Sequence, residues 1–423
     1  MQSFSQINKN LDKVKKFIKL KNKNFYHNNL NYFPLIKLLI FSDNLYKDKR
    51  SHQLIKNKIF SIIKFIFNLP IFLIDGFLYK NYIKKNLVNS DVVFFSDINF
   101  YYDKIKSKKF NAFIDPYFRL IAKNHSSIKL EIAPHWYKKK INKLIEPIYL
   151  KILYLDLLRF IIFKMKNYFF FQEEEFYTNL KPLLKKYKIN YKSTDLQKKY
   201  EKIYFHSKVL EKVLKKIKPK IVFLTCYYND MSLATILACK KLNIKTVDIQ
   251  HGGFEPAHLM YKYWQKSEIK KGYELLPNFF WVWKKEHLLD SFFKQNKNHT
   301  IIEGGKLVIQ KIEKIIKDSQ HNLSIQDKYF IKSLKKYERT ILFCATSELP
   351  KCLIEAIKLS QKNKKWMWMI RLHPRHSNYR ILKETLVKEK ILLKNVKIEK
   401  PSKLNLYLII NNSSHVLIDQ SSV

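Results

Sequence analysis

Glycine is scarce in this chain, with only six glycines in 423 residues. Five of them fall between positions 252 and 305: Gly252, Gly253, Gly272, Gly304 and Gly305. Glycine is the usual residue where the backbone takes a positive φ or must approach a ligand closely. A chain that uses so little glycine and concentrates it in one segment predicts special backbone there. We interpret that segment as the floor of a cleft.

Cysteine is also sparse. The chain has no CxxC pair, and no His, Cys, Asp or Glu set shows metal-ligand spacing. The four cysteines all lie in apolar stretches, which predicts small buried side chains in a reducing compartment: Cys226, Cys239, Cys344 and Cys352. The N-terminus shows no apolar core before a small-residue cleavage site, so no signal peptide is expected. We therefore expect a cytoplasmic protein without a metal or a resident cofactor.

Acidic residues are heavily outnumbered, since 81 Lys and Arg stand against 35 Asp and Glu, a formal charge of +46. One interpretation is an anionic partner, such as nucleic acid, a membrane leaflet or a phosphorylated substrate. The other is a coding bias toward Lys, Asn, Ile, Phe and Tyr, because the lysines are spread along the whole chain. The basic residues form no recognisable nucleic-acid module, so a nucleic-acid partner would rest on charge alone and is not expected.

Apolar runs suited to crossing a membrane are absent too. The most apolar run, residues 59–79, is interrupted by polar residues and a proline: Lys64, Asn68, Pro70 and Asp75. A second run, residues 150–171, is interleaved with charged residues. Both runs can lie in a membrane interface with lysines toward anionic headgroups, or can be core helices with solvated faces. We expect peripheral association with the inner face of the cytoplasmic membrane.

What the chain does contain is an alternation of strand and helix patterns. Residues 220–225 form a near-continuous apolar run, typical of a strand buried on both faces of a parallel sheet. A helical pattern follows, with Asn229 or Asp230 as its cap, and then a strand over 246–249. Strands are also expected at residues 91–96, 128–132, 278–283 and 300–303, whereas residues 136–216 show mostly helical spacing.

A second sheet pattern begins after a charged helical stretch. Strands are expected at residues 340–344, 366–370, 396–398 and 415–418, with helices over 349–361 and 401–410. The predicted class is α/β, with two doubly wound parallel sheets in succession. The expected parts are a helical basic N-terminal region (1–90), a first unit (91–315), a helical linker (316–338) and a second, partial unit (339–423).

Each half places a histidine just beyond a strand, His251 in the first and His373 in the second. Ligands of such sheets bind beyond the carboxyl ends of the strands, so the two imidazoles are expected to face one shared cleft. A neutral imidazole can accept a proton from a hydroxyl, and a donating one can hold a phosphate. The alternative interpretation is that either histidine is structural.

Other candidate phosphate contacts lie near His373 and near the last strand. Arg371 and Arg375 flank the histidine and offer bidentate contacts, or else form a solvated basic surface. Ser421 and Ser422 can donate hydrogen bonds to a phosphate, although a plain turn is an alternative. No P-loop, GxGxxG, HExxH, EF-hand or GxSxG motif is present.

Four motifs occur in order: QHGG at 250–253, GYELLP at 272–277 with FWVW at 280–283, RLHPR at 371–375, and the serine pair at 421–422. Together they resemble bacterial GT-B glycosyltransferases of capsule and surface polysaccharide synthesis, which include sialyl- and polysialyltransferases with HP and SS motifs. They are also similar to CDP-glycerol glycerophosphotransferases, which carry an HG motif. The resemblance covers roughly residues 91–423 and implies two facing Rossmann-like domains.

The resemblance also implies roles for individual residues. His251 is implied as the base that deprotonates the acceptor hydroxyl. The remaining positions are implied on the substrate and donor side, where they would contact the nucleotide-activated sugar: Gly252, Gly253, Ser347, Arg371, His373, Pro374, Arg375, Ser421 and Ser422. Ser347 is in addition expected to cap the helix over 349–361.

The expected function is therefore metal-independent transfer of a sugar or polyol phosphate from a nucleotide-activated donor. The expected acceptor is a capsular or other surface polysaccharide, or a lipid-linked precursor, as in lipopolysaccharide synthesis. Two alternatives stay open: a non-catalytic membrane-surface scaffold of a polysaccharide assembly complex, and a nucleotide-sugar epimerase of the same GT-B shape.

The second unit departs from the family pattern. In the enzymes that this chain resembles, the serine pair opens a helix and the sheet continues for several elements. Residues 339–423 fall short of a typical domain of this kind, of ~100–150 residues. We therefore expect a C-terminally truncated second domain, with its last strand near an exposed sheet edge.

Overall fold

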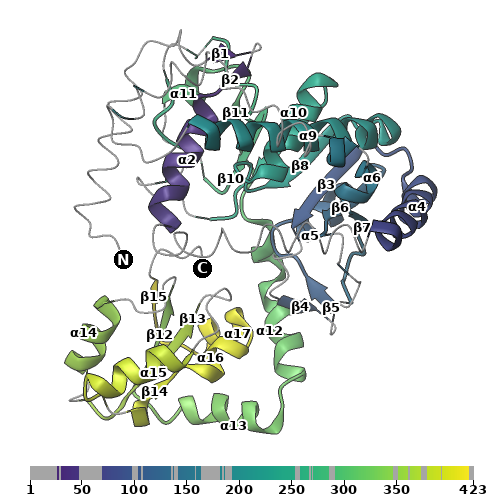
Figure 1. The fold of residues 1–423 in the computed structure, drawn as a ribbon. Coiled ribbons are helices and arrows are strands. Elements are labelled where there is room, and N and C mark those ends of the chain that lie inside the picture. Colours follow the sequence, from purple (N-terminus) through teal and green to yellow (C-terminus); the bar gives the residue numbers. More distant parts are fainter. Residues whose placement is uncertain are drawn as a thin grey trace.

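Two α/β units lie one above the other in the computed structural model, and helix α12 (Ile312–His321) runs along one side between them (Figure 1). The structure describes residues 26–27, 30–46, 69–97, 103–105, 108–134, 137, 142–157, 159–162, 182, 185, 193–252, 258–265, 268, 270–284, 291–345, 351–360, 363–372, 379–391 and 393–418.

The first unit is built on a seven-stranded parallel sheet with the order β11-β10-β9-β8-β3-β6-β7. From β3 (Val92–Asp97) the chain adds β6 (Ser127–Ile132) and β7 (Ile148–Leu150) on one side. It then returns to add four strands on the other side: β8 (Ile221–Thr225), β9 (Lys245–Ile249), β10 (Phe279–Val282) and β11 (Thr300–Glu303). The strand order therefore reverses between β3 and β8, and ligands of open α/β sheets bind at such a switch point.

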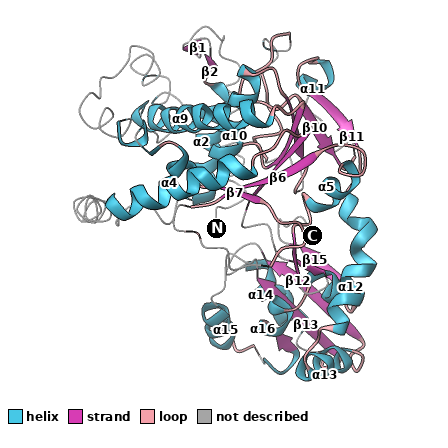
Figure 2. Ribbon diagram, turned by 90° about the vertical axis from the view of Figure 1, so that its right-hand side faces the viewer, coloured by secondary structure: helices cyan, strands magenta, loops and turns pink. Residues whose placement is uncertain are grey.

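Helices cover both faces of this sheet, which is why its central strands β3 and β8 are nearly continuous apolar runs. In Figure 2, one group of helices lies to the left of the strands: α2 (Phe33–Tyr46), α4 (Leu69–Asn86), α9 (Ser193–Ile217) and α10 (Asp230–Lys241). They share a core with Val93 and Val222. On the opposite face, α5 (Asp115–Ile121) and the 3-10 helix η5 (Leu307–Lys311) pack near Phe94 and Phe223, whose rings stack 4.9 Å apart.

Two ion pairs are buried on the α5 side of the sheet. Lys129 and Glu131 are alternate residues of β6, and they pair with Asp115 of α5 and with Lys143. All four side chains are fully enclosed. Charges enclosed in this way are tolerated only when each has an opposite charge and further hydrogen bonds, such as the backbone N–H of Asn111 donated to Asp115.

Shorter elements complete the first unit. Two antiparallel hairpins are formed by β1 (Tyr26–His27) with β2 (Leu30–Asn31), and by β4 (Asp103–Ile105) with β5 (Lys108–Phe110). The short helices are α6 (Ile152–Leu155) and α11 (Ser291–Gln295).

The second unit has a four-stranded parallel sheet with the order β14-β13-β12-β15. Its strands are β12 (Arg339–Ala345), β13 (Trp366–Leu372), β14 (Val396–Lys397) and β15 (His415–Ile418). One face packs against α14 (Lys351–Ser360) and α15 (Tyr379–Lys388), and the other against α13 (Ile325–Leu334) and α17 (Leu406–Asn411). The 3-10 helix η6 (Leu393–Asn395) and α16 (Glu399–Lys403) connect the strands.

The two units share a small apolar contact around α12. Ile315 of α12 is buried against Phe110 of β5 in the first unit, and Tyr407 of α17 in the second unit packs onto the same cluster. The connecting helix is thus anchored to both units by side-chain packing.

The predicted α/β class with two parallel sheets is confirmed, as are the predicted strands listed above and the Asn229 cap of α10. Three predictions were wrong. Residues 136–216 contain the strand β7, and the helix expected over 401–410 is two helices, because Asn405 interrupts it and caps α17 by accepting the N–H of Leu408. Cys226 is half-buried rather than buried, while Cys239 and Cys344 are buried as predicted.

Candidate active site

The turn that carries His251 begins where β9 ends and is tied to the neighbouring strand β10. The buried side chain of Gln250 donates from Nε2 to the carbonyl of Gly252 at 2.8 Å, and its Oε1 accepts the backbone N–H of Trp283 at 2.7 Å. The backbone N–H of Gln250 donates to the carbonyl of Trp281 at 2.9 Å. One glutamine therefore joins the ends of two strands and holds the backbone of His251 at the carboxyl edge.

The adjacent strand β8 ends in a sharp turn that brings two tyrosines to the same edge. Cys226 takes a φ of 57°, which bends the chain directly after the strand. Asn229 then begins α10 by accepting the backbone N–H of Ser232 at 2.8 Å. Tyr227 and Tyr228 lie between this turn and this cap, next to the end of β9.

The phenol of Tyr228 is shared by two imidazoles. Its Oη lies 3.4 Å from Nε2 of His251 and 3.2 Å from Nε2 of His258. A phenol has a single proton, so it can donate to one imidazole while its oxygen accepts from the other. Tyr228 therefore couples the proton positions of the two histidines.

Burial determines the protonation states of His258 and Tyr228. Burial, followed by the neighbouring charge of His251, lowers the pKa of His258 to about 3. Burial also raises the pKa of Tyr228 well above its usual range. At neutral pH, His258 is therefore a neutral imidazole and Tyr228 a protonated phenol, so neither brings a charge to His251.

A buried carboxyl lies beneath the cluster. Asp248 of β9 accepts the backbone N–H of Tyr227 at 3.1 Å and the hydroxyl of Tyr261 at 2.8 Å. Burial raises the pKa of Asp248 to about 8, so the neutral acid predominates at pH 7. The ring of Tyr261 in turn lies 4.8 Å from that of His258 and 6.0 Å from that of Tyr228. Asp248 thus positions the aromatic groups around the two histidines.

The β3 side of the switch point also contributes to this site. Phe113, in the turn before α5, meets the imidazole of His251 edge-on, with ring centroids 6.2 Å apart. Nowhere in the described part of the chain do three His, Cys, Asp or Glu side chains gather as a metal ion would require.

Most of the predicted donor residues lie outside the described residues: Gly253, Ser347, His373, Pro374, Arg375, Ser421 and Ser422. Arg371 is described. Its Nη1 donates to the carbonyls of Pro401 and Leu404, each at 2.6 Å, and so ties β13 to the C-terminal end of α16. The cleft shared by His251 and His373 stays a prediction, because residues 373–378, which follow β13, are not among the described residues.

The sequence pattern predicts a role for His251 but none for Tyr228, His258 or Asp248. A weak signal for each was present. Tyr228 follows directly on a buried strand, His258 closes the segment after the paired glycines, and Asp248 interrupts an apolar strand. Each signal becomes meaningful only when the adjacency of β8 and β9 is known.

Comparisons with known proteins give the following. Neither a protein-family model nor a curated protein matches the chain. The UDP-GlcNAc 2-epimerase from Neisseria meningitidis, solved with UDP-GlcNAc bound, is similar at 16% identity and a TM-score of 0.41, over 78% of this chain and 77% of that one. Another UDP-N-acetylglucosamine 2-epimerase shows 13% identity and a TM-score of 0.45, over 78% and 74%.

A third solved structure is the wall teichoic acid polymerase TagF, soaked with CDPG. It shows 10% identity and a TM-score of 0.34, over 86% of this chain and 74% of that one. All three are enzymes by their names. At TM-scores below 0.5, these likenesses carry no argument about the activity of this chain.

Proposed function

We propose that this chain is a GT-B-type glycosyltransferase that moves a sugar or polyol phosphate from a nucleotide-activated donor to a surface polysaccharide, with His251 as the base. The observation that carries the proposal is the Tyr228 hydroxyl between His251 and His258, at the carboxyl ends of two adjacent parallel strands. Such a position beside a switch point is where open α/β sheets bind their ligands.

In the proposed reaction, the acceptor hydroxyl gives its proton to the imidazole nitrogen of His251 that does not face Tyr228, while its oxygen forms a bond to the donor's sugar carbon or phosphorus. The bond from that atom to the leaving nucleotide phosphate breaks, and the phosphate takes the electron pair. Tyr228 keeps its proton toward the neutral His258, so its oxygen accepts the N–H at Nε2 of His251. This hydrogen bond stabilises the imidazolium as it forms.

On the donor side, the second unit neutralises the leaving phosphate. His373, Arg375 and the serines at 347, 421 and 422 are proposed to contact it directly. Arg371 has a different proposed role, because its guanidinium donates hydrogen bonds to two backbone carbonyls. It positions the end of β13, which directly precedes His373 in the chain. The proposed substrates are a nucleotide-activated sugar and a polysaccharide or lipid-linked acceptor, and no nucleic acid.

The outer face of α4 supports a membrane-surface location for this reaction. Four large apolar side chains of this helix are more than half exposed: Leu73, Ile74, Phe77 and Leu78. Lys84 and Lys85 follow in the last turn of the same helix. Exposed apolar residues beside lysines fit an interface in which the apolar face enters an anionic leaflet. No described helix is both long and apolar enough to cross the bilayer.

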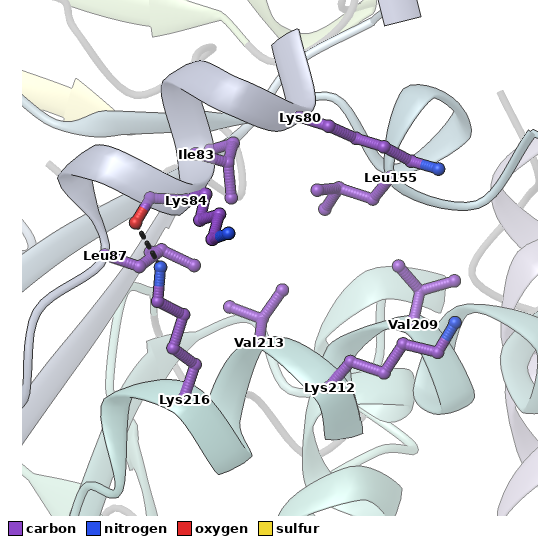
Figure 3. Close-up of a pocket in the computed structure, with 9 residues that line it drawn as sticks. All are labelled: Lys80, Ile83, Lys84, Leu87, Leu155, Val209, Lys212, Val213 and Lys216. Carbon is purple, nitrogen blue, oxygen red and sulfur yellow. Dashed lines mark hydrogen bonds between the residues drawn. The ribbon is translucent and has the colours of Figure 1, made fainter. Parts of the chain in front are cut away.

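A groove of about 280 Å³ beside α4 strengthens this inference (Figure 3). Apolar side chains such as Ile83, Leu155 and Val213 line it, and four lysines surround it: Lys80, Lys84, Lys212 and Lys216. Lys212 pairs with Asp156 at 2.5 Å, and Lys216 donates to the carbonyl of Lys84. A ring of lysines with an apolar floor is complementary to anionic lipid headgroups.

The proposed activity is tested by incubating the full chain with CMP-, UDP- and CDP-linked donors, with and without surface polysaccharide acceptors. Transfer in the presence of an acceptor is expected, and His251→Ala should lower kcat about 10²- to 10⁴-fold while donor binding is retained. A changed nucleotide sugar without any acceptor would instead show an epimerase. Membrane binding with no turnover of any donor would indicate that the protein is a scaffold. Normal turnover by His251→Ala would show that His251 is not the base.

A further inference from the structure

The pocket that carries a further inference lies along the outer edge of the first sheet, away from His251. It has a volume of about 620 Å³, within the range of small-ligand sites. One wall is the segment from Glu146 to Lys151, which contains the edge strand β7, and the opposite wall is the second half of α4. Strands in a sheet are ~4.8 Å apart, so β7 lies about 14 Å from β8 across the sheet.

Tyrosines dominate the lining of this pocket. Tyr79 and Tyr82 come from α4, with ring centroids 6.2 Å apart, and Tyr137 and Tyr149 come from the other wall, with centroids 5.2 Å apart. Tyr82 is 44% exposed, whereas Tyr149 is 9% exposed. Two pairs of aromatic rings therefore flank a space large enough for a ligand.

The backbone of the edge strand is not available to this ligand. The hydroxyl of Tyr79 donates to the carbonyl of Tyr149 and accepts the backbone N–H of Lys151 at 2.6 Å. One phenol thus satisfies backbone groups on the free side of β7, which blocks the addition of a further strand there. An extended peptide that pairs with β7 is therefore a poor match for the pocket.

Two other hydroxyls in the same lining, those of Tyr137 and Tyr149, are shielded from water and lie next to each other. At most one of them can donate to the other, and neither reaches a further described hydrogen-bond partner. A buried polar group without a partner is unfavourable in a folded protein. A ligand that carries its own hydroxyl groups would supply the missing partners.

The charges of the pocket indicate an uncharged ligand. Among the described residues of its lining, the ionisable side chains apart from the tyrosines are one carboxyl, Glu146, and one ammonium, Lys151, and the amide of Asn86 is nearby. A nucleotide or phosphate would need an excess of positive charge, which these described residues do not offer. Aromatic rings with scattered hydrogen-bonding groups instead match a sugar, whose C–H faces stack on rings while its hydroxyls bind polar groups.

We propose that the tyrosine pocket between α4 and β7 binds neutral saccharide units, and that it holds a distant part of the acceptor chain. Only the second clause rests on the proposed transferase function. A polymer whose growing end lies at His251 would reach this pocket with units further along the chain. Such a contact would favour long acceptors over short ones without taking part in the reaction.

The test is binding of maltotetraose, cellotetraose and chitotetraose to the full chain, measured by calorimetry with no donor present. At least one of them is expected to bind, and Tyr82→Ala and Tyr149→Phe should each weaken that binding about tenfold or more. Tyr149→Phe should change Tm little, because the hydroxyl that it removes has at most that of Tyr137 as a described partner. Tyr329→Ala, on the exposed side of α13, is the control for an unrelated tyrosine.

The proposal is overturned if none of the three tetrasaccharides binds at about 10 mM, or if both pocket variants bind as the wild type does. Because binding is measured without a donor, an inactive transferase would not alter the result. Conversely, His251→Ala should bind the tetrasaccharide with unchanged affinity. The experiment therefore distinguishes a pocket that does not bind saccharides from a protein that does not catalyse the proposed transfer.

Discussion

The hydroxyl of Tyr228 lies 3.4 Å from Nε2 of His251 and is also shared with His258. If it stabilises an imidazolium on His251, Tyr228→Phe should lower kcat about 10- to 100-fold, the effect of one hydrogen bond to a charged group. Substrate KM should change little, because the phenol contacts the base rather than the substrate. The acidic limb of the pH–rate profile should shift, which a purely structural tyrosine would not cause.

The control for this measurement is Tyr329→Phe, which removes a hydroxyl from an exposed tyrosine of α13. Its kcat and pH profile should match those of the wild type. A Tyr228→Phe enzyme with an unaltered profile would show that His251 acts without this phenol.

His299 is held in its neutral form by two backbone groups. Its Nε2 accepts the N–H of Tyr273 at 2.8 Å and its Nδ1 donates to the carbonyl of Pro277 at 2.7 Å. Burial lowers its pKa to about 4, against about 6.5 in an unfolded chain. Between these values the unfolded state binds more protons, so stability falls as the pH drops from 6.5 toward 4. The loss should approach about 1.4 kcal/mol per pH unit.

Urea unfolding at several pH values between 7 and 4 measures this dependence. His299→Gln should have a flatter pH dependence than the wild type, whereas His125→Gln, at an exposed position, should not. Some dependence will remain in His299→Gln, because burial also lowers the pKa of His206 to about 4 and of His258 to about 3. An unchanged slope in His299→Gln would contradict the assignment.

Asp248 is expected to make the stability of the fold depend on pH in the opposite direction. Burial raises its pKa to about 8, so the folded state keeps a proton that the unfolded state loses near pH 4. The contribution of this carboxyl to stability therefore decreases as the pH rises from 4 to 8. Asp248→Asn keeps the shape and cannot ionise. Its stability relative to the wild type should increase over this range, by up to about 1.4 kcal/mol per pH unit.

The matched control is Asp75→Asn, at an exposed position of α4. Its stability relative to the wild type should show no comparable rise between pH 5 and 8. Parallel curves for Asp248→Asn and the wild type would mean that the carboxyl is ionised in the fold.

Gly304 lies against the indole of Trp281. A Cβ at this position would come 2.0 Å from Cε2 of the ring, and the ring is held because its Nε1 donates to the carbonyl of Gly305 at 3.1 Å. Gly304→Ala should therefore reduce the free energy of unfolding by about 1–3 kcal/mol. Gly76→Ala is the control, since its nearest atom would be 3.8 Å away. Within helix α4, alanine should stabilise by about 0.5–1 kcal/mol.

Thermal melts of the two variants should move in opposite directions from the wild type. Equal or higher stability of Gly304→Ala would mean that the indole has room to shift.

The lysine-lined groove beside α4 predicts charge-dependent membrane binding. In flotation with anionic phosphatidylglycerol vesicles, the double variant Lys80→Glu, Lys84→Glu should bind at least tenfold more weakly, since each lysine near such a surface contributes about 1 kcal/mol. The same change at Lys394 and Lys397, exposed in the second unit, is the control and should have a smaller effect. Equal binding of both double variants would show that net charge alone drives association.

The agreement between predicted and observed strands has a simple physical origin. A strand buried on both faces needs apolar side chains at nearly every position, so β8 and β12 stand out in the sequence without knowledge of their neighbours. The strand β7 was missed because it has three residues and a free edge capped by Tyr79, a residue some seventy positions away. Nothing local distinguishes such a segment from its helical surroundings.

The candidate site, too, could be predicted from the sequence only in part. His251 could be found because a strand end followed by two glycines is a local signal. Tyr228 and His258 could not, because they meet His251 only through the pairing of β8 with β9 and the return of the chain near residue 258. Likewise, the alternation of charged and apolar residues in β6 is typical of a strand with a solvated face, yet Lys129 and Glu131 are enclosed with opposite charges.

By itself, the sequence determined the α/β class, the order of the strands along the chain and the place of His251 beyond one of them. Only the tertiary structure decided which strands are neighbours, and hence that Tyr228 joins two histidines, that β6 carries enclosed ion pairs and that a tyrosine pocket lies along β7. The reason is that periodicity records whether a residue is buried, whereas strand order and packing decide what buries it.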